Sequence, residues 1–250
     1  MPGKNVNPKP KPTMTTGYAN PYVVAGAEPS VRAQFIKQTY FHLAGAIAVF
    51  ILVESMLLKL DGIESMIITM TGGMGWLLVL GAFMAVSYIA NKWAMSDSSK
   101  AMQYAGLALF TIAEAIIFLP LIYIALTYMP AGSELVAKAG LITAVMVAGI
   151  TMTAFITNKD FSFLSGILTI GGFVALGIIV ASILFGFGLG LIFSGAMAIF
   201  ASVSILHSTS NIIHHYPPGK HVAASLQLFA GIALLFWYIL QILIALSGRD

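Results

Sequence analysis

Seven long apolar runs constrain this chain more than any other feature of its sequence. Each run has about the 20 residues that an α-helix needs to cross the hydrocarbon core of a bilayer. Only 8% of the residues are charged, against about 25% in a soluble domain, so lipid is the expected surrounding of most of the chain. The runs lie at about residues 39–58, 73–91, 103–128, 138–157, 163–184, 187–207 and 222–246.

These runs predict an all-α, polytopic membrane protein with seven transmembrane helices around a central apolar helix. We expect two parts, a polar Pro-rich tail over residues 1–34 and a transmembrane domain over residues 35–250. The tail is too polar to fold alone, so it is either solvated or an arm that docks on a partner. Only Phe185 and Gly186 separate the fifth and sixth runs, which predicts a tight hairpin.

The stretch from Ser182 to Tyr216 is the expected centre of the bundle. It passes three glycines in five positions, continues apolar for about a membrane thickness, and ends in a series of hydroxyl, amide and imidazole groups. Glycines let helices approach closely, and polar groups at membrane depth need partners on neighbouring helices. We therefore expect the sixth run to be the inner helix.

Lysine and arginine are unevenly distributed between the two predicted sides of the membrane. Because cytoplasmic loops carry an excess of these residues, we expect a cytoplasmic N-terminus and an external C-terminus. The net charge of +3 comes largely from the tail and does not indicate nucleic-acid binding. One side holds Lys4, Lys9, Lys11, Arg32, Lys37, Lys92, Lys100, Lys159 and Lys220, and the other holds Lys59, Lys138 and Arg249.

Two carboxylates lie inside predicted spans, where a charged group is costly and usually functional. Glu54 is near the end of the first span, close to Lys59, and is either a boundary residue that reaches the interface or an ion ligand. Glu114 is deeper, six residues before Pro120, and we expect it to face the bundle interior as a proton or cation ligand.

The polar end of the sixth run offers a face but no recognisable catalytic or metal site. At helical spacing the face would line a cavity or contact a neighbouring helix. The histidines match no zinc pattern, so neither a metal nor a cofactor is expected. Ser194 and His207 would lie about 20 Å apart on one helix, too far to share a proton, so we do not expect an enzyme. The face consists of Ser204, Ser208, Asn211 and His215.

Several short segments, taken in order, are similar to the Bax inhibitor-1 family, which includes bacterial YccA- and YetJ-like proteins. The similarity covers about residues 33–246 and includes the third span with Glu114. The segments are Phe35-Ile36-Lys37-Gln38-Thr39-Tyr40, Asn158-Lys159-Asp160-Phe161-Ser162-Phe163-Leu164, Leu184-Phe185-Gly186-Phe187, Ile205-Leu206-His207-Ser208-Thr209-Ser210 and Leu234-Leu235-Phe236-Trp237-Tyr238-Ile239-Leu240.

This resemblance implies a seven-helix bundle in a bacterial inner membrane or an organelle membrane. It also implies a pH-sensitive calcium leak and regulation of cell death or of membrane proteolysis. The family's leak is attributed to two aspartates, on the last two helices, that share a proton. Here Ser208 and Gly231 stand at those places, and neither can titrate. We therefore expect the pH gate of the family to be absent.

Two functional hypotheses remain. The first is a modulator or accessory subunit of a membrane complex, for example a membrane protease, which contacts lipid and other membrane proteins but no nucleic acid. Its contacts would use the tail and small-residue helix faces. The alternative is a pH-sensitive calcium or proton leak channel that uses Glu114, Glu54 or Asp160. The small-residue faces are Gly140, Ala144 and Ala148, and Gly186 and Gly190.

Overall fold

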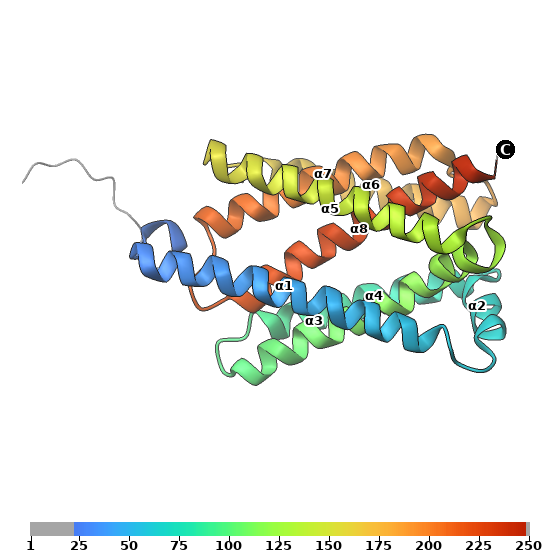
Figure 1. The fold of residues 1–250 in the computed structure, drawn as a ribbon, viewed down its shortest axis with the longest axis horizontal. Helices are drawn as coiled ribbons and strands as arrows, with labels where there is room; N and C mark the ends of the chain where they lie inside the picture. Colours follow the sequence, from blue (N-terminus) through green and yellow to red (C-terminus); the bar gives the residue numbers. More distant parts are fainter. Residues whose placement is uncertain (1–22, 249–250) are drawn as a thin grey trace, which may run out of the picture.

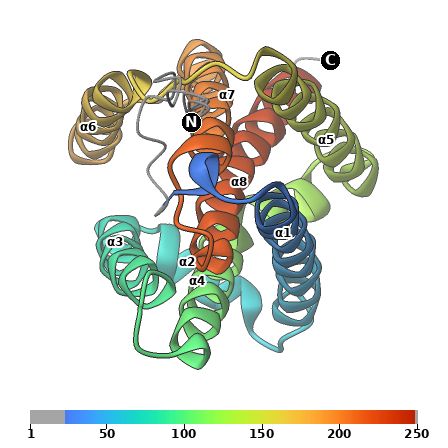
Figure 2. The ribbon, with the colours of Figure 1, turned by 90° about the vertical axis from the view of Figure 1, so that its left-hand side faces the viewer.

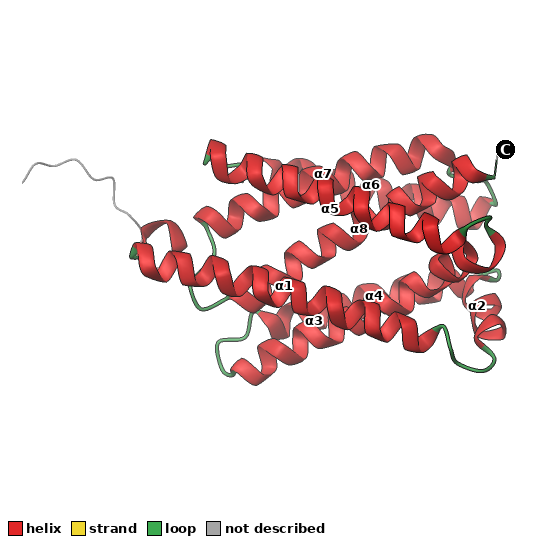
Figure 3. Cartoon of the chain, viewed as in Figure 1, coloured by secondary structure: helices red, strands yellow, loops and turns green. Residues whose placement is uncertain are grey.

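The computed structural model describes residues 23–248, which consist of helices and connecting loops (Figures 1 and 3). The part of the predicted tail before residue 23 lies outside the described residues. The elements are η1 (Val24–Gly26), α1 (Pro29–Leu57), α2 (Ile63–Thr71), α3 (Gly75–Ala94), α4 (Lys100–Tyr128), α5 (Gly132–Thr157), α6 (Leu164–Phe185), α7 (Gly190–His214) and α8 (His221–Ser247).

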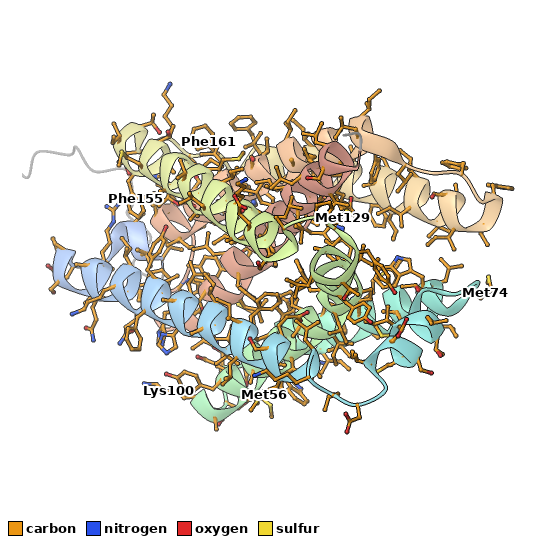
Figure 4. All side chains as sticks on the ribbon, turned by 45° about the vertical axis from the view of Figure 1, so that its right-hand side comes forward. Met56, Met74, Lys100, Met129, Phe155 and Phe161 are labelled. Carbon is orange, nitrogen blue, oxygen red and sulfur yellow. The ribbon has the colours of Figure 1, made fainter. Side chains whose placement is uncertain are left out.

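Seven of these helices, all except η1 and α2, are long and apolar enough to cross a membrane. This confirms the predicted all-α fold with seven spans. Apolar side chains project from the outer faces of the bundle (Figure 4), and the labelled Met56 and Met74 are 61% and 62% exposed. Such a continuous apolar exterior fits contact with lipid rather than with water.

The helix at the centre is α8, so the expectation that the sixth run would be the inner helix is wrong. α8 packs against α1, α3, α4, α5 and α7, and Figure 2 shows it in the middle of the bundle. The sixth run forms α7, whose outer face is open: Ile192 is 90% exposed and Ile199 is 69% exposed. Polar residues near the C-terminal end of α7 are buried, but α7 lies beside α8 and is not the axis of the fold.

The predicted hairpin between the fifth and sixth runs is confirmed, because α6 ends at Phe185 and α7 begins at Gly190. Gly186 and Gly190 have positive φ angles of 72° and 67°, a conformation that glycine adopts without steric cost. A Cβ at either position would meet nothing within 4 Å. These two glycines therefore make the turn possible, and they do not form the small-residue helix face that we expected from the sequence.

The structure departs from the predicted elements in two ways: the first span begins earlier, and there is an additional short helix. α1 begins at Pro29, ten residues before the predicted first span. The short helix α2, of 9 residues, lies between the first two spans at one end of the molecule (Figure 1). A helix of that length rises about 14 Å, which is too short to cross the membrane.

Gly106 of α4 lies at a close contact with α3. A Cβ there would lie 2.5 Å from the carbonyl oxygen of Ala90 and 2.6 Å from the amide nitrogen of Ala94. Both atoms belong to the backbone of α3, so neither can move aside as a flexible side chain would. The approach of α3 to α4 therefore requires glycine at this position.

We expect Gly106→Ala to lower the stability of the bundle by about 1–3 kcal/mol, the usual cost of overpacking. Thermal unfolding of the purified protein in mild detergent would measure the change. Gly149→Ala is the matched control, because a Cβ at Gly149 meets nothing within 4 Å. Equal melting temperatures for the two variants would contradict the close approach of α3 and α4.

Candidate functional site

Ser208 and Gly231 lie in the interface between α7 and α8. Ser208 is 1% exposed, and its hydroxyl has no hydrogen-bond partner among the described residues. A Cβ on Gly231 would lie 3.0 Å from Cγ1 of Ile205, one turn before Ser208 on α7. Ile205 is itself fully buried. Its side chain thus occupies the space that any larger residue at position 231 would need.

Glu114 is buried, 6% exposed, and faces the bundle interior as expected. It lines a cavity of about 430 Å³ whose walls come from α3, α4, α6, α7 and α8. Most of the wall is aromatic or aliphatic. Three further polar side chains, Ser87, Tyr238 and Gln241, also line it. Glu114 therefore belongs to this largely apolar cavity and not to the close interface between Ser208 of α7 and Gly231 of α8.

Two contacts at this cavity were not predicted from the sequence. Ser194 Oγ donates a hydrogen bond to Oε1 of Gln241 at 3.1 Å, which links α7 to α8 beside the cavity. Trp76 and Trp237 stack with ring centroids 6.3 Å apart and an angle of 18° between their planes. The sequence signal for these contacts was the presence of polar and aromatic residues inside apolar runs. The signal does not show which of these residues come into contact, because that depends on how distant helices pack.

Glu54 is also buried, 4% exposed, and its two carboxylate oxygens have no hydrogen-bond partner among the described residues. It therefore faces the bundle, against the alternative of a boundary residue that reaches the interface. It does not line the cavity that holds Glu114. The two membrane carboxylates thus lie in separate environments and do not form a pair.

Asp160 lies in the loop between α5 and α6, where it meets His215 at the end of α7. Nε2 of His215 donates to Oδ2 of Asp160 at 2.8 Å, and both side chains are nearly half exposed. The amide of Phe161 also donates to Oγ of Ser210 at 2.8 Å. These contacts attach the loop to α7, and nothing in their geometry connects Asp160 with Glu114 or Glu54.

The predicted polar face of α7 is divided among several partners. Asn211 Nδ2 approaches Nε2 of His207 at 3.4 Å, Ser208 is buried against α8, and His215 binds Asp160. Ser204 is half-buried. The face therefore does not line one common site. Over residues 23–248, no three His, Asp or Glu side chains come close enough together to hold a metal ion.

Another polar cluster, not foreseen from the sequence, joins the middle of α1 to the N-terminal ends of α4 and α8. Nδ1 of His42 donates to the Gln38 carbonyl at 2.7 Å, so its Nε2 accepts from the Tyr104 hydroxyl at 3.1 Å. The ring centroids of His42 and His221 are 4.9 Å apart. The neighbouring Lys220, 8% exposed, donates to two carbonyls of the loop between α3 and α4, at 2.9 and 2.7 Å. These contacts fix that end of the bundle.

The sequence profile of the family described as Inhibitor of apoptosis-promoting Bax1 matches residues 32–248, which is nearly all of the membrane domain. The chain belongs to the Bax inhibitor-1 family. This confirms the resemblance.

Three proteins are similar to parts of this Bax inhibitor-1 family member. An uncharacterized protein of Pseudomonas aeruginosa is 37% identical over 123 residues, which cover 49% of this chain and 55% of that protein. An uncharacterized protein of Neisseria meningitidis is 26% identical over 177 residues, or 70% of this chain and 75% of that protein. Bax inhibitor 1 of Schizosaccharomyces pombe is 29% identical over 181 residues, which cover 70% of this chain and 64% of that protein. The chain thus spans about half the length of the first relative.

The contact between Asp160 and His215 predicts a contribution to stability that is lost at acid pH. Burial raises the pKa of Asp160, but hydrogen bonds from His215 and Ser162 outweigh it and lower the pKa to about 2. The usual value is about 3.9. A lowered carboxyl pKa adds stability above about pH 4 that is lost as the pH falls to about 2.

We therefore expect Asp160→Asn to destabilise the protein at neutral pH by less than about 1 kcal/mol, because exposed pairs contribute little. Melting temperatures of the variant and the original protein should converge as the pH falls from about 4 to about 2. Asp61→Asn, at an exposed carboxylate, is the control. A difference that stays constant down to the lowest pH would disprove the role of the Asp160 carboxylate.

Proposed function

We propose that this Bax inhibitor-1 family protein acts by contact, as a modulator or accessory subunit of a membrane complex such as a membrane protease. The observation that carries the proposal is the packed interface at Ser208 and Gly231. Two adjacent carboxylates share a proton because both cannot ionise cheaply, and a serine with a glycine offers no such pair. The Ile205 side chain fills the neighbouring space. A pH gate at this place therefore has neither its titrating groups nor room to hold them.

An outward face on α5 supports contact with another membrane helix. Ala144 and Ala148 are exposed, and a Cβ on Gly140 would meet nothing within 4 Å. These small residues, spaced four apart, are not used for packing within the bundle. In lipid, small residues at such spacing let a partner helix approach closely. This face is the surface we propose for the contact.

The first described residues are fixed to the end of the bundle nearest the proposed cytoplasmic side. The amide of Val24 donates to the Tyr216 carbonyl at 2.9 Å, and Val24 is fully buried. We propose that the preceding tail, outside the described residues, extends from this point toward a partner. An odd number of spans places the two ends of the domain on opposite sides, and the lysine and arginine bias supports a cytoplasmic N-terminus in an inner membrane.

The second candidate function is a proton or calcium leak. The observation in its favour is that Glu114 lines a cavity. Asp160 is engaged with His215 outside the spans, and Glu54 lies away from the cavity. Glu114 is thus the one of the three proposed carboxylates that the geometry favours for ion passage. Flux measurements on reconstituted protein distinguish this function from contact.

Contact through α5 predicts that Ala144→Phe weakens association with a membrane partner. The added ring would hold a neighbouring helix away from the backbone of α5. We expect the amount of any specific co-purifying protein, quantified by mass spectrometry after extraction in mild detergent, to fall by about tenfold, a change of about 1.4 kcal/mol. Ile142→Phe is the matched control, since Ile142 is exposed on α5 and lies about 160° around the helix from Ala144.

Association that survives Ala144→Phe but not Ile142→Phe would place the contact elsewhere on α5. Equal recovery of all associated proteins with both variants and the original chain would reject α5 as the contact surface. Melting temperatures of both variants must match that of the original protein, so that a loss of partner is not a loss of fold.

A further inference from the structure

We infer that the cavity between α3, α4, α6, α7 and α8 is a binding site for a lipophilic organic cation. The Glu114 carboxylate supplies the counter-charge, and the aromatic wall supplies the surface for the apolar body of the ligand. This inference does not rest on the proposed function, because contact through α5 requires no ligand in the cavity.

The first argument is charge. Glu114 is the one charged residue among those that line the cavity. Glu114 is only 6% exposed. It takes part in no hydrogen bond or ion pair within residues 23–248. A carboxylate removed from water must be protonated or find a positive partner. Among the described residues, the lining contains no lysine, arginine or histidine, so a positive partner must come from outside the lining.

The second argument is the aromatic wall. Trp76 and Trp237 stack on one side, and Phe118 meets Trp237 edge-on with centroids 5.0 Å apart. Phe193 and Tyr238 form another edge-on pair at 6.0 Å. The faces of aromatic rings attract cations within about 6 Å of the ring centroid, and tryptophan does so best. A carboxylate among such rings is the combination that proteins use to bind quaternary ammonium groups.

The third argument excludes a hard metal cation as the natural occupant. Calcium takes 6–8 oxygen ligands in proteins. Besides Glu114, the cavity offers oxygens from Ser87, Tyr238 and Gln241, and Gln241 Oε1 already accepts from Ser194. The supply of oxygens is too small for calcium, while the apolar area is large. The volume of about 430 Å³ lies within the range of cavities that hold small organic ligands.

The probe for the test is tetraphenylphosphonium, with tetraphenylborate as its counterpart of similar shape and opposite charge. Two of the three tryptophans of the chain, Trp76 and Trp237, line the cavity, so intrinsic fluorescence reports binding to the full-length protein in detergent. We expect saturable quenching by the cation and none by the anion. Glu114→Gln should raise the dissociation constant for the cation by at least about tenfold.

Two further variants make the test specific. Glu54→Gln removes the other buried membrane carboxylate, which lies outside the cavity, and should leave the affinity unchanged. Ala230→Leu adds bulk to the cavity wall from α8 while retaining Glu114, and should also weaken binding. This second route keeps the test decisive if Glu114→Gln does not fold, which size-exclusion chromatography would show.

Three results would overturn the inference. One is the absence of saturable binding of tetraphenylphosphonium to the original protein. Another is equal affinity of the original protein and a folded Glu114→Gln variant, which would show that the carboxylate does not recognise the charge. The third is equal binding of the cation and of tetraphenylborate, which would indicate partition into detergent or a purely apolar site.

Discussion

The packing of α8 against its neighbours is the interaction on which the rest of this bundle depends. Leu228, Leu235 and Leu240 of α8 are almost completely buried, and α8 contacts α1, α3, α4, α5 and α7. In a bilayer, lipid tails are as apolar as leucine, so helices associate through close packing and polar contacts rather than through exclusion of water. Close approaches, such as Gly231 against Ile205 and Gly106 against α3, therefore matter more here than the total apolar area.

The packing of α8 separates two places in the bundle. On the side of α7, α8 forms a close interface in which Gly231 accommodates Ile205, and neither Ser208 nor Gly231 supplies a carboxylate. On the side of α3 and α4, the same helix presents Trp237 and Gln241 to the cavity that contains Glu114. The interface is suited to a fixed contact. The cavity is suited to a ligand, because its one carboxylate has no partner within the described residues.

The spans and the interior position of Glu114 could be predicted from the sequence because both follow from local composition and the cost of burying charge. The identity of the inner helix could not. All seven runs are apolar enough to be central. The polar end of α7 was a misleading guide, since its polar groups contact several partners, among them the loop between α5 and α6. The cavity was also beyond prediction, because Trp76, Ser194 and Gln241 come together only when distant helices pack.

Calcium entry into proteoliposomes is the most direct test of the central claim, that the α7–α8 interface is a fixed contact without a pH gate. We expect the original protein to show little entry and no change between about pH 6 and about pH 8, where a shared proton on a carboxylate pair would exchange. Ser208→Asp with Gly231→Asp, combined with Ile205→Ala to make room, should introduce pH-dependent entry. Strong, pH-dependent calcium entry through the original protein would contradict the claim, and its loss in Glu114→Gln would place the pathway in the cavity.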